Sequence, residues 1–314
     1  MQLYRSRGFG DFFQDTFAFL KQNGKHFFKH YFIINGIFLL LLLAMGYFFT
    51  KFYTDFIFGS ALRNQDMSAI DNFMNDNFGL FIVLLFFFVI VALIAGTVSY
   101  AYMPIYLKLY NENSGKGFDT KDIISTYKNN LGKIGVFVIC SILLFIPLII
   151  VLGICSFILM ITIIGILAIP LLFGGFMLFY TMTLMEYLND EKGIWECFGY
   201  SWSLITSKFW AAIGSVGIFY LMSYIAQNVV GLIPYFFGMA SLFSSTYDGD
   251  QPSNDEIGLT FTIIMMSVFF ISFILGAILG NIVQLNQGIV YYGLKEGKEN
   301  INTKDDIDLI GSGE

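Results

Sequence analysis

The sequence predicts an all-α integral membrane protein with six transmembrane helices, arranged as three hairpins. Hydrophobic residues make up 56% of the 314 residues and charged residues only 13%, whereas soluble domains carry ~25% charged residues. The mean hydropathy is +0.70. Residues 134–185 contain no Asp, Glu, Lys, Arg or His, and this run has room for two membrane helices of ~20 residues each. We therefore expect a single polytopic membrane domain over residues 1–314.

An amphipathic helix with one aromatic face is expected ahead of the first transmembrane helix. The residues of this face recur at the spacing of a helix that lies in the membrane interface. They are Phe9, Phe12, Phe13, Thr16, Phe17 and Leu20. Residues 31–49 and 78–107 are then expected to form the first hairpin. The polar residues 51–77 are expected to be the loop that joins its two helices.

A second amphipathic helix and the charge-free run are expected to form the central hairpin. Asp119 is expected to cap the start of this amphipathic helix, because a carboxylate can accept hydrogen bonds from the first free backbone N–H groups. Residues 134–185 then supply both transmembrane helices. The Gly-Ile-Cys-Ser sequence at residues 153–156 is expected to be the turn between them.

The last hairpin is expected to follow a third amphipathic helix that contains Trp195 and Trp202. Its transmembrane helices are expected at residues 209–230 and 257–292. Residues 231–243 are expected to form an interfacial piece, because Pro234 interrupts a continuous helix.

These elements predict a threefold internal repeat, with units at residues 9–112, 118–190 and 194–296 and a mobile polar tail at residues 297–314. Each unit has an aromatic residue six positions before a lysine, and the predicted interfacial pairs are Phe19 and Lys25, Tyr127 and Lys133, and Trp202 and Lys208. The first and third units also match in length from this lysine to the tyrosine that ends the unit. Interfacial anchoring without repetition is the alternative, because aromatic residues and lysines collect at any membrane interface.

The distribution of positive charge predicts the orientation in the membrane. All Lys and Arg residues except Lys51 and Arg63 lie on one side of the predicted membrane. They precede the first hairpin, lie between consecutive hairpins, or follow the last hairpin. Loops rich in Lys and Arg stay in the cytoplasm. We therefore expect a multi-pass protein of the bacterial inner membrane with both termini in the cytoplasm.

The main polar concentration within the expected membrane helices is a group of amides near the end of the sixth helix. These residues are Asn281, Gln284, Asn286 and Gln287, and Gln227 and Asn228 of the fifth helix are candidates to join them. They are predicted either to make hydrogen bonds between helices, or to line a cavity for a lipid headgroup or a solute. The nearby GxxxG motif, Gly276 to Gly280, is expected to permit close helix packing.

Other chemistry receives little support from the sequence. The expected spans lack ionisable residues at mid-depth, which proton relays and ion-coupled transporters usually need, and no motif for nucleotide, zinc or nucleophilic catalysis stands in a fitting context. His26 and His30 have no carboxylate or cysteine near them in sequence, so we expect interfacial anchors there and neither a metal site nor a cofactor. The three cysteines have no paired spacing and are expected to be small buried hydrophobes.

The C-terminal region resembles the end of a broad bacterial group of six-span membrane proteins. The similar residues are Asn286 to Glu299, with the sequence NQGIVYYGLKEGKE, and Asp305 to Gly311. The group includes the membrane domain of some glycerophosphodiester phosphodiesterases, and stand-alone members that are sometimes labelled carotene oxygenases. The resemblance implies an accessory membrane module without the phosphodiesterase activity, because that catalytic domain is absent. An oxygenase would need more iron-binding histidines than the two present.

Three functional hypotheses follow. The first is a non-enzymatic inner-membrane protein that interacts with lipids, or with a membrane-protein partner as an accessory or scaffold subunit; no nucleic acid is expected to bind. The second is a lipid or small-solute transporter or flippase that uses the amides of the sixth helix. The third is an enzyme acting on lipid headgroups through Glu186, Glu196 or His30, and it requires two such groups within hydrogen-bond reach.

Overall fold

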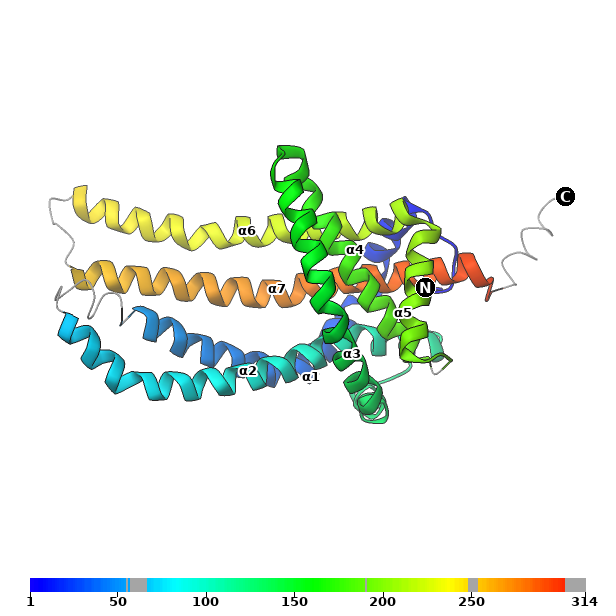
Figure 1. The fold of residues 1–314 in the computed structure, drawn as a ribbon, viewed down its shortest axis with the longest axis horizontal. Helices are drawn as coiled ribbons and strands as arrows, with labels where there is room; N and C mark the ends of the chain where they lie inside the picture. The colour runs from blue at the N-terminus through cyan, green and yellow to red at the C-terminus, as the bar shows by residue number, and fades with distance from the viewer. Residues whose placement is uncertain (55, 57–66, 190, 248–253, 303–314) are drawn as a thin grey trace. The chain divides into compact units, whose positions relative to one another are not determined.

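The protein is an all-α, multi-pass membrane protein. The computed structural model describes residues 1–54, 56, 67–189, 191–247 and 254–302 (Figure 1). Across these residues it contains seven helices and no strand: α1 (Phe9–Thr54), α2 (Met67–Glu112), α3 (Thr120–Met160), α4 (Ile163–Tyr187), α5 (Ile194–Ser207), α6 (Phe209–Tyr247) and α7 (Asn254–Glu299). All of them except α5 are long and apolar enough to cross a membrane, which gives the 6 spans that the sequence predicts.

The chain divides into two compact units. Unit 1 contains Met1–Ile34, Thr97–Ser223 and Leu279–Glu314, and unit 2 contains Asn35–Gly96 and Tyr224–Ile278. The helices α3, α4 and α5 belong wholly to unit 1, whereas α1, α2, α6 and α7 each contribute segments to both units. The bounds of the helices fall close to those of the predicted repeat units. Structural equivalence of these units stays a prediction.

The predicted amphipathic helices take two different forms. The first and second are continuous with the membrane helices that follow them, within α1 and α3. The third is a separate helix, α5, because Lys208 leaves the helical conformation with φ −138° and ψ 55°. Only the third amphipathic segment can therefore set its direction independently of the following span.

The central hairpin turns later than the sequence predicts. Residues 153–156 lie inside α3, which continues to Met160, and α4 begins at Ile163. The side chain of Thr162 accepts a hydrogen bond from the backbone N of Gly165 at 2.9 Å. A membrane helix must satisfy its free N–H groups internally, and the Thr162 side chain does this for one N–H group in the first turn of α4. The predicted turn was therefore wrong, because the chain turns between Met160 and Ile163 and not at residues 153–156.

The predicted start of the second amphipathic segment is confirmed in detail. Asp119 accepts hydrogen bonds from the backbone N of Lys121 at 2.7 Å and of Asp122 at 3.2 Å. The Asp122 side chain in turn accepts one from the backbone N of Asp119 at 2.7 Å. This reciprocal capping box holds the first turn of α3.

Two segments, one predicted as a loop and one as an interfacial piece, contain helix. The polar segment 51–77 includes the last turn of α1 and the first turns of α2; its residues 55 and 57–66 lie outside the described part. The segment 231–243 is part of α6, with Pro234 inside the helix. Neighbouring helices can satisfy the carbonyl that a proline leaves free in a membrane, so Pro234 does not break the helix.

Close packing of α4 and α6 in unit 1 depends on glycine rather than on the GxxxG motif of α7. A Cβ atom placed on Gly217 would lie 2.6 Å from Leu171 Cγ and 2.9 Å from Leu171 Cα. On Gly174 it would lie 3.2 Å from Gly217 Cα. In the GxxxG motif of α7, a Cβ on Gly276 would lie 3.5 Å from Gln227 Oε1, which is an ordinary contact, and one on Gly280 would meet nothing within 4 Å. Small residues that let two helix backbones approach are the usual device for packing helices in membranes.

Candidate functional site

A buried ion cluster lies where α4 ends. It consists of Glu186 on α4, Lys192 between α4 and α5, and Tyr291 with Lys295 one turn apart on α7. We call these four residues the Glu186 cluster; all belong to unit 1. Glu186 has no exposed surface, and Lys295 is only 3% exposed. Burial of these charges is costly unless each is paired.

Three donors saturate the Glu186 carboxylate. Its Oε1 accepts a hydrogen bond from Lys192 Nζ at 2.6 Å, and its Oε2 accepts one from Tyr291 OH at 2.6 Å and one from Lys295 Nζ at 2.9 Å. The Tyr291 oxygen also accepts a hydrogen bond from Asn189 Nδ2 at 3.1 Å. The carboxylate thus joins α4, α7 and the segment leading into α5, and its charge is already matched within the protein.

An aromatic ring of α5 covers the lysines of the cluster. The Nζ atom of Lys192 lies 4.2 Å from the centre of the Tyr200 ring, and that of Lys295 lies 5.9 Å from it. Lys298, outside the cluster, lies 4.9 Å from the same ring. Burial lowers the pKa of Lys192, but the hydrogen bond and charge of Glu186 outweigh this and leave the pKa raised. Burial, followed by the hydrogen bond and charge of Glu299, raises the pKa of Tyr200. Both groups keep their protonated forms around neutral pH.

Two further lysines bind the carbonyl groups at the C-terminal end of α4. Lys108 Nζ donates to the backbone O of Leu188 at 2.6 Å, and Lys133 Nζ donates to the backbone O of Tyr187 at 3.0 Å. Cations are stabilised there because the last carbonyls of a helix are unpaired and carry partial negative charge. Lys133, a predicted interfacial residue, therefore also has an intramolecular role.

The helix α5 presents tryptophan outward while its other face is packed. Cys197, Phe198 and Leu204 are buried, whereas Trp195 is 56% and Trp202 60% exposed. Trp210, at the start of α6, is 79% exposed. These are all the tryptophans in the sequence, and we call the three residues the tryptophan surface. Tryptophan is enriched at membrane–water interfaces, where its ring is amphipathic.

The predicted amides of α7 lie in two hydrogen-bonded groups of unit 1. Asn286 is fully buried, and its Nδ2 donates to Thr16 Oγ1 at 3.0 Å and to Ser215 Oγ at 3.1 Å, which joins α7 to α1 and α6. Gln287 is 1% exposed, and its Oε1 accepts a hydrogen bond from Thr181 Oγ1 on α4 at 2.7 Å. Both amides thus make the contacts between helices that one alternative predicted.

The remaining predicted amides are distributed over both units. Asn281 is buried and Gln284 half-buried in unit 1. Gln227 and Asn228 belong to unit 2, where Asn228 is exposed and donates to the backbone O of Tyr224 at 2.8 Å. Contact of any of these amides with a ligand stays a prediction.

The predicted interfacial residues differ in exposure. Phe19 is fully buried, with its ring centre 5.1 Å from that of Tyr110, and Tyr127 is 8% exposed and donates to the backbone O of Val98. Lys25 is exposed on α1, whereas Lys208 donates to the backbone O of Arg7 at 3.2 Å.

Sequence reasoning missed most of the Glu186 cluster. It identified Glu186 only as the end of a charge-free span and as a weak catalytic candidate. Lys295 lies 109 positions away in sequence, so its partner could not be read from spacing. The one available signal was the pair Tyr291 and Lys295 at helical spacing, which places a hydroxyl and an ammonium on one face of α7.

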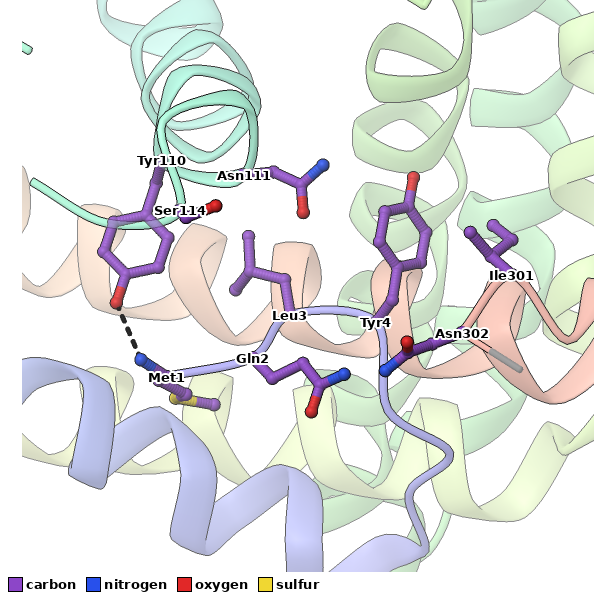
Figure 2. Close-up of a pocket in the computed structure, with 9 residues that line it drawn as sticks. All are labelled: Met1, Gln2, Leu3, Tyr4, Tyr110, Asn111, Ser114, Ile301 and Asn302. Carbon is purple, nitrogen blue, oxygen red and sulfur yellow. Dashed lines mark hydrogen bonds between the residues drawn. The ribbon is translucent and has the colours of Figure 1, made fainter. Parts of the chain in front are cut away.

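A polar pocket of unit 1 lies beside the N-terminal segment (Figure 2). It has a volume of ≈ 450 Å³ and is lined by Met1, Gln2, Leu3, Tyr4, Tyr110, Asn111, Ser114, Ile301 and Asn302. The amino group of Met1 donates to Tyr110 OH at 3.0 Å. Burial, together with the charges of nearby carboxylates, Glu186 first, raises the pKa of Tyr4 to about 12. The pocket offers hydroxyls and amides, and Tyr4 stays neutral at physiological pH.

No family model, curated protein or solved structure matches this chain. The resemblance to the membrane domain of glycerophosphodiester phosphodiesterases therefore stays a prediction, and the functional argument depends on the geometry of unit 1.

Proposed function

We propose that this chain is a non-enzymatic membrane protein that binds lipid at the cytoplasmic interface through the tryptophan surface of α5 and α6. The observation that supports this most directly is the exposure of all three tryptophans within one short segment. The buried face of α5 contains Cys197 and Phe198, and the Glu186 cluster fixes the segment before it. The helix α5 itself contains no Lys or Arg, and Lys192 and Lys208 flank it. Exposed tryptophan between flanking lysines is typical of a segment that lies in the membrane interface.

The engagement of the candidate catalytic groups favours binding over catalysis. Glu186 is saturated by three donors from the protein. Glu196 accepts a hydrogen bond from the backbone N of Gly193 at 3.0 Å and so caps α5. His30 bonds to His26 and to Thr120. Each of the three groups that an enzyme would need is thus held by a structural contact.

The proposed location is the bacterial inner membrane, with both termini in the cytoplasm. The asymmetric distribution of Lys and Arg supports it. The test is a set of reporter fusions after residues 112, 190 and 302, with control fusions in the segments 55–66 and 248–253. A cytoplasmic reporter should be active only at the first three positions; the reverse pattern would overturn the orientation.

Lipid binding is best tested by tryptophan fluorescence, because all the tryptophans belong to the proposed surface. The protein is reconstituted in nanodiscs in which some phospholipids carry brominated acyl chains, which quench nearby tryptophan. We expect strong quenching, a preference for anionic over zwitterionic headgroups in native mass spectrometry that the lysines supply, and fewer bound lipids in Trp202→Ala. Trp202→Phe is the control that retains aromatic bulk. Equal quenching of the native surface and a soluble indole would contradict the proposal.

A lipid or solute transporter is the second candidate, and one observation favours it. The Nε2 atom of Gln287 is buried and makes no hydrogen bond, which leaves a free donor on α7 where a substrate could bind. The test is lipid flipping in proteoliposomes followed by dithionite bleaching of labelled lipid. A transporter should lose flipping activity in Gln287→Leu, whereas Asn228→Leu should keep it. Flipping at the rate of protein-free vesicles in the native protein excludes this candidate.

An accessory role toward another membrane protein remains part of the same proposal. It is tested by crosslinking in the native membrane from photoreactive residues placed at Trp195 and Trp210. Lipid adducts support the lipid-binding function, whereas a single crosslinked polypeptide of constant mass would replace it with a scaffold function.

A further inference from the structure

The two histidines of the chain face each other on α1, in unit 1. His26 and His30 are one helical turn apart, and their Nε2 atoms lie 3.1 Å from each other. The backbone O of Phe118, in the segment between α2 and α3, lies 3.3 Å from His26 Nε2. His26 Nε2 thus lies close to both a second ring nitrogen and a carbonyl oxygen, although the sequence around the histidines shows no acidic or thiol ligand.

The other nitrogen of each ring is held from outside. His26 Nδ1 lies 2.9 Å from Tyr106 OH on α2, and His30 Nδ1 lies 2.6 Å from Thr120 Oγ1 at the start of α3. Histidines that bind metals almost always use their second ring nitrogen in such a hydrogen bond, which fixes the tautomer and the ring orientation. With both Nδ1 atoms engaged, the Nε2 atoms are the ones left to face a ligand.

The separation of the two Nε2 atoms matches the spacing of two ligands on one metal ion. Histidine nitrogens bind zinc at ~2.0–2.1 Å in tetrahedral geometry, which places two of them roughly 3.3 Å apart. The observed 3.1 Å is close to this value. We propose that His26 Nε2, His30 Nε2 and the Phe118 carbonyl bind one borderline divalent ion of the zinc and copper class. Water completes its coordination.

Without the ion, one proton holds the same atoms together. The Nε2 of one ring donates to the Nε2 of the other, so exactly one of the two facing nitrogens carries a hydrogen. The ion replaces this proton, and binding therefore competes with protonation. Imidazole suits zinc, copper and nickel, whereas magnesium and calcium prefer oxygen ligands, so the site should reject the latter two.

The surrounding charges set the strength of binding. Asp119 acts on His30 as a nearby negative charge, whereas Lys29 acts on both histidines and Lys116 on His26 as positive charges. Tyr106 is the titratable group that α2 contributes at this place. One carboxylate against two ammonium groups disfavours a cation, so the site should bind more weakly than a structural zinc site with four protein ligands. His26 is half-buried, whereas His30 is 5% exposed, so an ion would reach the site from the side of His26.

Metal binding at this site can be measured without background from other histidines, because the chain contains only these two. The full-length protein, purified in detergent without a histidine tag, is titrated with Cu²⁺ and examined by electron paramagnetic resonance. We expect one ion per chain and a spectrum that shows coupling to two nitrogens. His26→Gln and His30→Gln should each lower the affinity at least tenfold, whereas Gln22→Ala, on the exposed side of the same helix, should not change it. Equal binding by the native protein and the double histidine variant would overturn the proposal.

A second measurement avoids any effect of substitution on folding. The native protein is labelled with ¹⁵N only in histidine, and its two imidazoles are followed by nuclear magnetic resonance during addition of Zn²⁺. The proposal expects both Nε2 signals to shift together and saturate at one equivalent, with Mg²⁺ at tenfold excess causing no shift. Unchanged Nε2 signals, or a shift of one ring only, would contradict a shared site. This inference uses none of the residues of the tryptophan surface, so either proposal can fail alone.

Discussion

Replacement of Glu186 by glutamine should destabilise unit 1 strongly. The substitution retains the shape of the side chain but removes the negative charge that Lys192 and Lys295 share. Lys295 is 3% exposed, so its ammonium group would stay buried without an ionic partner. Loss of one partner of a buried ion pair typically costs about 3–5 kcal/mol. This corresponds to a fall in melting temperature of roughly 6–20 °C for a unit of this size.

The assay is thermal unfolding in detergent, followed by tryptophan fluorescence, since α5 carries two of the fluorophores next to the cluster. The matched control is Glu191→Gln. Glu191 is 63% exposed and lies 3.9 Å from both lysine Nζ atoms, and exposed ion pairs contribute about 0–1 kcal/mol. We therefore expect a shift of at most a few degrees for the control.

A double variant separates the charge effect from simple loss of contacts. In Glu186→Gln combined with Lys295→Met, no buried ammonium is left without its partner, and Lys192, whose side chain is 28% exposed, can turn toward water. The double variant should be more stable than the sum of the two single effects predicts, by about 1–3 kcal/mol. Additive effects, or equal melting temperatures for Glu186→Gln and Glu191→Gln, would refute the assignment of Glu186 as the centre of a buried ion cluster.

Three further predictions concern packing, reactivity and capping. Gly217→Ala should destabilise unit 1 by about 1–3 kcal/mol in the same thermal assay, because the added Cβ atom would press on the Leu171 backbone. The control is Gly199→Ala, whose added Cβ atom would have no neighbour within 4 Å. This variant should be neutral or slightly stabilising. Cys197 should react with iodoacetamide at pH 8 about 100-fold more slowly than a free thiol. The reason is that burial, and then the charge of Glu186, raises the pKa of its thiol from 9.0 to about 11. Equal labelling in the native and denatured protein would contradict this prediction. The pKa of Asp119 is lowered because backbone N–H groups of α3 donate hydrogen bonds to its carboxylate. The contribution of this cap to stability should therefore be present above pH 3.8 and be lost as the pH falls further. Asp119→Ala should abolish this acid dependence.

The sequence was sufficient to predict the class of fold and the number of spans. A long apolar segment can satisfy its backbone hydrogen bonds in a bilayer only as a helix. The pattern of apolar segments along the chain therefore indicates six membrane helices. The turn of the central hairpin was not predictable in the same way. Residues 134–185 contain no charged residue, so no polar loop marks the turn. Ser156 and Thr162 are both residue types that can cap a helix, and in the structure the cap of α4 is Thr162.

The candidate site could be predicted only in part. The tryptophans and amides were visible as residue types, and the expectation that amides join helices agrees with the contacts of Asn286. The partners of Glu186 come from α7 and from the segment before α5, and nothing in the sequence pairs these segments. The carbonyl of Phe118 near His26 is a backbone atom whose position depends only on the fold. Sequence patterns report side-chain types along one element, whereas both sites depend on contacts between elements.

The stability of the Glu186 cluster and the proposed binding of lipid should be coupled through α5. Lys192 belongs to the segment that leads into α5, and Tyr200 of α5 covers its ammonium group, so the cluster fixes where α5 begins and which face it exposes. If Glu186→Gln frees this segment, Trp195 and Trp202 lose their common orientation before unit 1 unfolds. Quenching by brominated lipid should then weaken at temperatures where the overall helix content is still unchanged. Unaltered quenching up to the unfolding temperature would show that α5 is held by its apolar face alone, and that the ion cluster stabilises α4 and α7 without orienting the tryptophan surface.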